Sequence, residues 1–136
     1  MSRYRRTSIK SKWYLDDELY DTVFHYARNY PTWKAECEVY ESAIAIRYDK
    51  ERVQTSGDYD PTETMAIRHA SLSLKLSLIE QALEIAAPEE SIRQFLRLGV
   101  CYGLTWYQLQ RKRMPCGRNA YSAMRGRFYY ELAQKI

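Results

Sequence analysis

One segment sets the architecture open to this chain: residues 62–86 contain no helix-breaking residue and form a single continuous run. Before the run come Asp60, whose carboxylate can cap a helix, and a proline at the first helical position, and Glu63 follows three residues after the cap. Apolar residues recur along it at helical intervals, at Met65, Leu72, Leu76, Ile79, Leu83 and Ile85. The segment therefore predicts one long central helix, about 38 Å in length at 1.5 Å per residue.

This central helix is apolar on more than one side, so it needs cover from other helices of the chain or from a second copy. Apolar residues between Leu15 and Ala27 repeat every three to four positions and predict a helix over about 15–29. Pro31 is expected to break the chain and Thr32 to cap a second helix that ends near residue 48. The two helices are expected to pack antiparallel, and residues 49–60, with Gly57, to form an exposed loop.

The sequence after the central helix is also helical in pattern. Pro88 ends the central helix, and a further helix begins with Glu89 and Glu90 in its first turn and ends at Gly103. We expect an all-α fold in three regions: a basic flexible arm over 1–12, an acidic helical region over 13–87 with the antiparallel and central helices, and a basic helix-turn-helix region over 88–136.

Charge is segregated along the chain in a way that the net charge of +4 hides. Residues 1–12 carry five basic side chains and no acidic one, residues 13–90 carry a net charge of −9, and residues 91–136 carry a net charge of +8. A compact segment at +8 repels itself, and its most common use is to meet a polyanion such as nucleic acid. The alternative is that this basic surface packs against the acidic half of the same chain.

Several classes of protein are disfavoured by the sequence. No apolar run is long enough to span a membrane, and the basic N-terminus has no apolar segment behind it, so we expect a cytoplasmic protein without a membrane anchor. Three widely spaced cysteines fit reduced thiols, and no Cys or His spacing is typical of a metal site. No nucleophile–base pair or glycine-rich phosphate loop is present, so we expect neither an enzyme nor a cofactor.

The last 35 or so residues have the organisation of a helix-turn-helix. Thr105 can cap a short helix that reaches about Gln110, with Leu109 pointing inward, and residues 114–117 supply a turn. A second helix then begins near Arg118. Its packing face is expected to follow a spacing of four residues, at Ala120, Met124, Phe128 and Leu132.

The opposite face of this second helix provides the candidate DNA contacts. Hydrogen-bonding side chains at the start of a recognition helix can reach base edges in the major groove, and five residues are expected to face outward there: Arg118, Asn119, Tyr121, Ser122 and Arg125. A second set is expected to contact backbone phosphates: Thr105, Arg111, Lys112, Arg113 and Arg127. The first set would determine which DNA sequence is bound, and the second would position the recognition helix on the duplex.

Two stretches resemble a known family, the phage late-gene transcriptional regulators of the RinA and ArpU type. These are SGDYDPTETMAIRHASLSLKLSLIEQALEIA, residues 56–86, and FLRLGVCYGLTWYQLQRKRMPCGRNAYSAMRGRFYYELA, residues 95–133. The resemblance implies a C-terminal half similar to region 4 of bacterial sigma factors, with the recognition helix beginning at Arg118, Asn119, Ser122 and Arg125. The sequence departs from the family pattern at Gln110 and at Lys112-Arg113, where the family has a small residue and a glycine-containing turn.

These observations predict a transcription regulator of phage or prophage type that binds double-stranded DNA. Host RNA polymerase and a second copy of the chain are further candidate partners. A dimer suits half-sites about 34 to 36 Å apart, and a monomer acting beside RNA polymerase is just as compatible with the sequence. The alternative is a small protein-interaction module, such as a DNA-packaging subunit or an inhibitor of a host factor, that acts through the acidic helices. Substitutions in the basic helix would impair only the first, and charge reversals on the acidic helices only the second.

Overall fold

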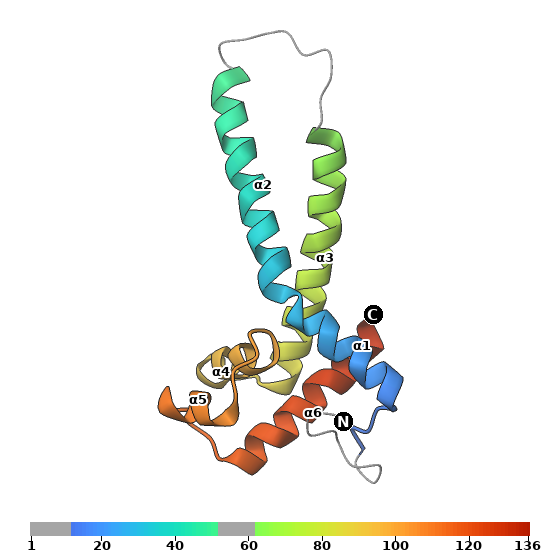
Figure 1. Cartoon of the computed structure of the whole chain (residues 1–136), viewed down its shortest axis with the longest axis vertical. Helices are drawn as coiled ribbons and strands as arrows, with labels where there is room; N and C mark the ends of the chain where they lie inside the picture. Colours follow the sequence, from blue (N-terminus) through green and yellow to red (C-terminus); the bar gives the residue numbers. More distant parts are fainter. Residues whose placement is uncertain (1–11, 52–61) are drawn as a thin grey trace.

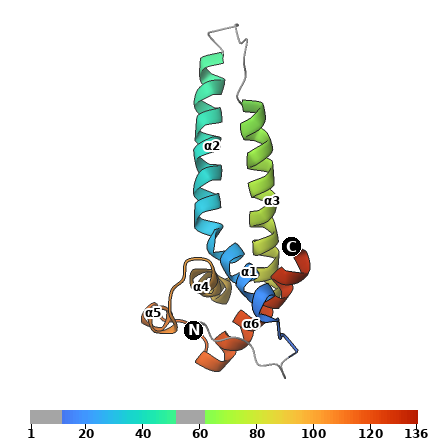
Figure 2. The same ribbon diagram turned by 45° about the vertical axis from the view of Figure 1, so that its right-hand side comes forward.

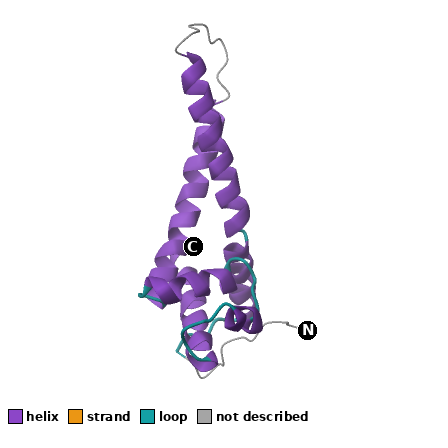
Figure 3. Ribbon diagram, turned by 90° about the vertical axis from the view of Figure 1, so that its left-hand side faces the viewer, coloured by secondary structure: helices purple, strands orange, loops and turns teal. Residues whose placement is uncertain are grey.

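The computed structural model describes residues 12–51 and 62–136, and over these ranges the chain forms six α-helices and no strand (Figures 1 and 3). In chain order they are α1 (Asp17–Arg28), α2 (Tyr30–Glu51), α3 (Thr62–Ala86), α4 (Glu90–Val100), α5 (Trp106–Arg111) and α6 (Arg118–Lys135). The predicted all-α fold is confirmed for these ranges. Residues 1–11 of the predicted arm and 52–60 of the predicted loop lie outside the described residues.

The predicted central helix is α3, and its partner is α2. Figures 1 and 2 show the two helices side by side, running in opposite directions and extending away from the other four. Cys37 and Leu72 are buried on this helix pair. Two polar contacts also join it: the guanidinium of Arg68 donates from Nε and Nη2 to the two carboxylate oxygens of Glu36, at 2.9 and 3.0 Å. The α2–α3 pair is therefore held together by a narrow apolar seam and surface ion pairs.

The expectation that the first two helices pack antiparallel is wrong. Asn29 alone separates α1 from α2, and the chain bends there and continues into α2 without reversing direction (Figures 1 and 2). Pro31 lies in the first turn of α2, where backbone amides have no partner within the helix, so the missing amide of proline costs no helical hydrogen bond. The amide of Trp33 still donates to the carbonyl of Asn29 at 3.0 Å. Neither the break at Pro31 nor the cap at Thr32 is present, because α2 already begins at Tyr30. The one connecting residue, Asn29, is too short to reverse the chain, so the two helices do not pack antiparallel.

The main hydrophobic core lies where the second half of α3 meets α1, α4, α5 and α6. Its fully buried side chains come from all five helices and include Val23, Ile79, Leu83, Leu96, Leu109, Phe128 and Leu132. Each such side chain contributes about 1.5 to 3 kcal/mol on transfer from water. Residues 13–87 and 88–136 thus differ in charge but share one core, and α5 and α6 are held against α3 and α4.

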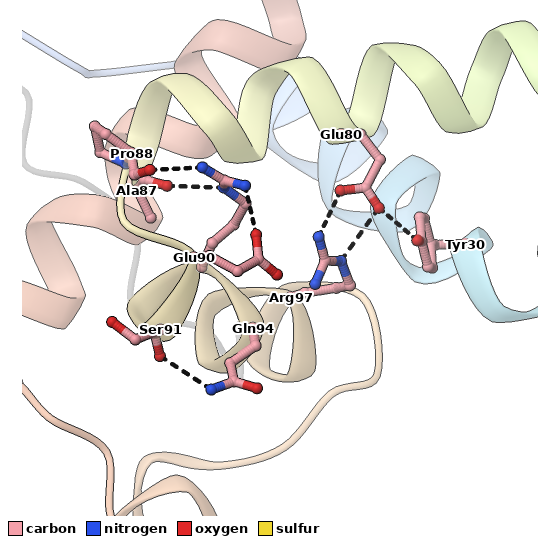
Figure 4. Close-up of polar contacts among 9 residues, drawn as sticks. Tyr30, Glu80, Ala87, Pro88, Glu90, Ser91, Gln94 and Arg97 are labelled. Atoms are coloured by element: carbon pink, nitrogen blue, oxygen red, sulfur yellow. Dashed lines mark hydrogen bonds and ion pairs between the residues drawn. The ribbon is translucent and has the colours of Figure 1, made fainter.

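A partly buried polar cluster fixes α4 against α2 and α3 (Figure 4). The carboxylate of Glu80 on α3 accepts a hydrogen bond from the Tyr30 hydroxyl at 2.6 Å and two from the Arg97 guanidinium, at 2.6 and 3.2 Å. Burial opposes ionisation of Glu80, but the hydrogen bonds and charge supplied by Arg97 and the Tyr30 hydroxyl outweigh it, so the pKa of this carboxyl lies below its usual value. The cluster sets the orientation of α4, the helix that precedes the basic C-terminal elements.

Candidate nucleic-acid interface

Helix α5 begins as the sequence predicts. The Thr105 hydroxyl accepts a hydrogen bond from the amide of Gln108 at 3.3 Å, and the Gln108 side chain accepts one from the amide of Thr105 at 2.8 Å. This reciprocal capping box satisfies two amides that a helix start leaves without partners. Leu109, as expected, is fully buried and anchors this six-residue helix to the core.

The connection from α5 to α6 turns at Arg113. Its φ of 67° lies in the left-handed region, which glycine adopts at no steric cost and other residues adopt at about 1 to 2 kcal/mol. The amide of the next residue, Met114, donates to the Leu109 carbonyl at 3.2 Å and closes the turn. The turn was predicted at 114–117. The connection between the helices includes these residues but begins two residues earlier, and Arg113 occupies the position for which a glycine would be favoured.

The packing face of α6 differs from the predicted one in its first turns. Phe128 and Leu132 are fully buried, as expected, but Ala120 is exposed and Tyr121 is buried, at 7% exposure. The ring of Tyr121 lies 5.6 Å from that of Trp106, and its hydroxyl occupies the space that a side chain at Gly99 would fill. A tyrosine buries far more apolar surface than an alanine. The expectation that Tyr121 faces outward to contact bases is therefore wrong.

Arg125 also differs from its expected position. Its side chain is half-buried and directed toward α1, where Nη2 donates to the Tyr20 hydroxyl at 3.3 Å. The guanidinium lies 5.5 Å from the ring centroid of Tyr129, within the range of a cation–π contact. An arginine held in this way joins α6 to α1. The outward orientation predicted for Arg125 is therefore wrong, and its expected role as a base contact loses its basis.

The other predicted contacts lie at the surface. Arg118, Asn119 and Ser122 are exposed on the first turns of α6, and the five residues proposed for phosphate contact are also exposed: Thr105, Arg111, Lys112, Arg113 and Arg127. We call these eight residues the α5–α6 surface. The first turn of α6 contains no acidic residue, and its N-cap Gly117 has no side chain that could occupy the helix amides. The positive end of the helix dipole therefore adds to the basic side chains.

One basic residue beside this surface, Arg28, was not predicted from the sequence. Arg28, in the last turn of α1, lines the same cavity as Arg118 and Arg125. Its sequence context is that of an ordinary basic residue at a helix C-terminus, which is favourable there for electrostatic reasons alone. Only the packing of α1 against α6 brings it close to the C-terminal region, so no local signal could have identified it.

No protein-family model, curated protein or solved structure matches this chain. The resemblance to phage late-gene regulators therefore stays a prediction. Within the described ranges, no helix is both long and apolar enough to cross a membrane. Across residues 12–51 and 62–136, no three His, Cys, Asp or Glu side chains gather in a way that could hold a metal ion.

Proposed function

We propose that this protein is a transcription regulator that binds double-stranded DNA through the α5–α6 surface. The observation that carries the proposal is the position of Arg118, Asn119 and Ser122, which are exposed together on the first turns of α6 and flanked by exposed basic residues. In a helix-turn-helix, the N-terminal residues of the second helix contact base edges. We propose α5 as the first helix and α6 as the recognition helix.

Base reading is assigned to three residues instead of five. Arg118 has the donors to pair with guanine, Asn119 has the donor and acceptor to pair with adenine, and the hydroxyl of Ser122 can bond to either. Tyr121 and Arg125 are on the side of α6 that packs against the rest of the protein, where Tyr121 contacts Trp106 and Arg125 contacts Tyr20. Each bidentate base contact contributes about 1 to 3 kcal/mol of discrimination between base pairs.

Phosphate contact is assigned to the basic residues around this helix start. Arg111, Lys112 and Arg113 follow one another along the end of α5 and the turn, and all three are exposed. Arg127 is exposed farther along α6, nine residues after Arg118, and its guanidinium lies 5.3 Å from the ring centroid of Trp13. Four such cations would release about four counterions from duplex DNA, which makes binding strongly salt-dependent.

A second copy of the chain is the partner that we propose for the α2–α3 pair. Val39 and Ile46 on α2 are 67% and 58% exposed, and Ile67 and Leu74 on α3 are 67% and 62% exposed. Residues seven apart lie on the same face of a helix, so each helix presents an apolar stripe to solvent. Two antiparallel pairs with such stripes can bury them in a four-helix bundle. A dimer would present two recognition helices to a two-fold symmetric DNA site.

The phage or prophage role, and contact with host RNA polymerase, are proposed on the sequence resemblance. The alternative of a protein-interaction module rests on the acidic side of α2, where Glu38 and Glu41 are exposed. The two proposals differ in which surface is needed. Reversing the charge of Glu38 would impair the module and leave the DNA-binding protein unaffected.

The test is binding of fluorescently labelled duplexes to the full chain, using DNA from around its own gene and a shuffled duplex of the same composition. We expect selective binding by the wild type and loss of selectivity in Arg118→Ala/Asn119→Ala. Lys34→Ala is the control, because it removes an exposed basic residue on α2 that lies away from the α5–α6 surface and forms none of the ion pairs among the described residues. Equal affinity of the wild type for the two duplexes would contradict sequence-specific regulation.

A further inference from the structure

A cavity of about 350 Å³ lies between α1, the α4–α5 connection and the first turns of α6. Three arginines line it, Arg28 from α1 and Arg118 and Arg125 from α6, together with the hydroxyl-bearing residues Thr105 and Ser122. No carboxylate is among the described residues of its wall. Three positive side chains around one cavity repel each other, and an anion bound between them would relieve that repulsion.

Arg28 is held at the cavity by its surroundings. Its guanidinium lies 5.6 Å from the ring centroid of Phe24 and directly against the backbone of Gly103. A Cβ atom at Gly103 would come within 2.5 Å of that guanidinium, and the φ of 77° at this glycine is unfavourable for any other residue. The α4–α5 connection therefore both turns at Gly103 and leaves the space that Arg28 fills.

Arg118 and the hydroxyl of Thr105 complete the polar wall. In the part of the chain that the structure describes, neither Arg28 nor Arg118 forms an ion pair with a carboxylate. The guanidinium of Arg118 lies 5.8 Å from the ring centroid of Tyr107. The Thr105 oxygen accepts the Gln108 amide, which leaves its own proton to donate. The cavity thus offers guanidinium and hydroxyl donors from three separate segments.

We propose that this cavity binds the phosphate group of a nucleotide. Guanidinium groups match phosphate oxygens with paired donors, and hydroxyl groups supply additional donors. Cavities that bind small ligands begin at about 300 Å³, so this one has room for a group attached to the phosphate. Trp106 and Leu104 supply an apolar wall against which a base can lie. The phosphate can come from a free nucleotide or from a nucleic-acid strand.

Arg28 separates this proposal from the proposed DNA contacts, because it belongs to α1 and not to the α5–α6 surface. The experiment is calorimetric titration of the full chain with AMP, inorganic phosphate and adenosine at about 50 mM salt, where electrostatic binding is strong. We expect AMP to bind more tightly than phosphate and adenosine not to bind. Arg28→Met should lower the affinity for AMP about tenfold or more, as expected for loss of a charge-assisted contact.

Two further variants make the result decisive. Arg68→Met is the matched control and should bind AMP like the wild type. Arg118→Met repeats the AMP titration if Arg28→Met loses its circular dichroism spectrum, and it is not used with duplex DNA because Arg118 is also a proposed base contact. If AMP does not bind but Arg28→Met weakens duplex DNA binding about tenfold, the phosphate belongs to DNA. Adenosine binding as tightly as AMP overturns the proposal, as does an Arg28→Met variant that behaves like wild type with both ligands. Binding of AMP by a protein that binds no duplex would contradict the proposed function alone.

Discussion

The close approach of the Tyr121 hydroxyl to Gly99 predicts that Gly99→Ala will destabilise the protein when Tyr121 is present and stabilise it when residue 121 is phenylalanine. Gly99 lies within α4, where glycine to alanine normally stabilises a helix by about 1 kcal/mol. Here an alanine Cβ would lie 1.9 Å from the Tyr121 hydroxyl oxygen, so the buried ring would have to move. Overpacking of this kind costs about 1 to 3 kcal/mol. We expect Gly99→Ala to destabilise the protein by about 1 kcal/mol once the helix gain is included.

Removing the hydroxyl should reverse this sign. In a Tyr121→Phe background the nearest atoms to the new Cβ are the ring Cζ at 3.0 Å and Leu109 Cδ1 at 3.4 Å, which need give by only a few tenths of an ångström. Gly99→Ala should then stabilise the protein by up to about 1 kcal/mol, a coupling of about 2 kcal/mol between the two sites.

The effect of Gly99→Ala on the free energy of unfolding is measured with and without the Tyr121 hydroxyl. The four proteins are the wild type, Gly99→Ala, Tyr121→Phe and the double variant, each unfolded in urea and followed by far-UV circular dichroism. Gly117→Ala serves as the matched control, because a Cβ there meets no atom within 4 Å, and its effect should be the same in either background. The reasoning is refuted if Gly99→Ala shifts the free energy of unfolding equally with and without the Tyr121 hydroxyl. Such a result would also contradict the close approach of the Tyr121 hydroxyl to Gly99.

Three other predictions concern the turn, the polar cluster and the helix pair. Arg113→Gly should raise the free energy of unfolding by about 0.5 to 1 kcal/mol, because it relieves a left-handed arginine, yet weaken DNA binding by removing a phosphate contact; equal or lower stability in urea would contradict the assigned backbone. Glu80→Gln should destabilise the protein by about 1 to 2 kcal/mol at pH 7. Because the folded pKa of Glu80 is depressed, its stabilising effect is present above the unfolded pKa of about 4.3 and is lost as pH falls through the folded pKa. The gap between wild type and Glu80→Gln in urea unfolding should therefore close in acid, and a gap that persists there would be inconsistent with the ion pair. Ile67→Glu/Leu74→Glu should convert a dimer to a monomer in sedimentation equilibrium, and a monomeric wild type would rule out the proposed bundle.

The sequence predicted the elements of the fold better than their packing. The capped run after Asp60 and the capping box at Thr105 are local signals, and both mark helices in the structure. The prediction that α2 runs antiparallel to α1 required the chain to reverse near Pro31, but only Asn29 separates the two helices. A proline signal cannot decide this, because proline is tolerated in the first turn of a helix.

The candidate site was predicted only where exposure follows from local pattern. Arg118, Asn119 and Ser122 face solvent as expected, but the spacing of four from Phe128 placed Ala120 inside in error. The buried residue is Tyr121, because a glycine on another helix, Gly99, leaves room for its ring. This depends on a pairing between α4 and α6 that no single segment encodes. The same holds for Arg28, which approaches the C-terminal helices only in the folded chain.

The salt dependence of duplex DNA binding tests the central claim most directly. With the four exposed cations that we assign to phosphate contact, Arg111, Lys112, Arg113 and Arg127, the affinity should fall by about 100-fold between about 50 and 200 mM salt. Arg111→Ala/Lys112→Ala should reduce the slope of log affinity against log salt by about 2, while the control Lys34→Ala leaves it unchanged. If the folded protein does not bind duplex DNA at about 50 mM salt, or if its affinity does not change with salt, DNA recognition by this surface is contradicted.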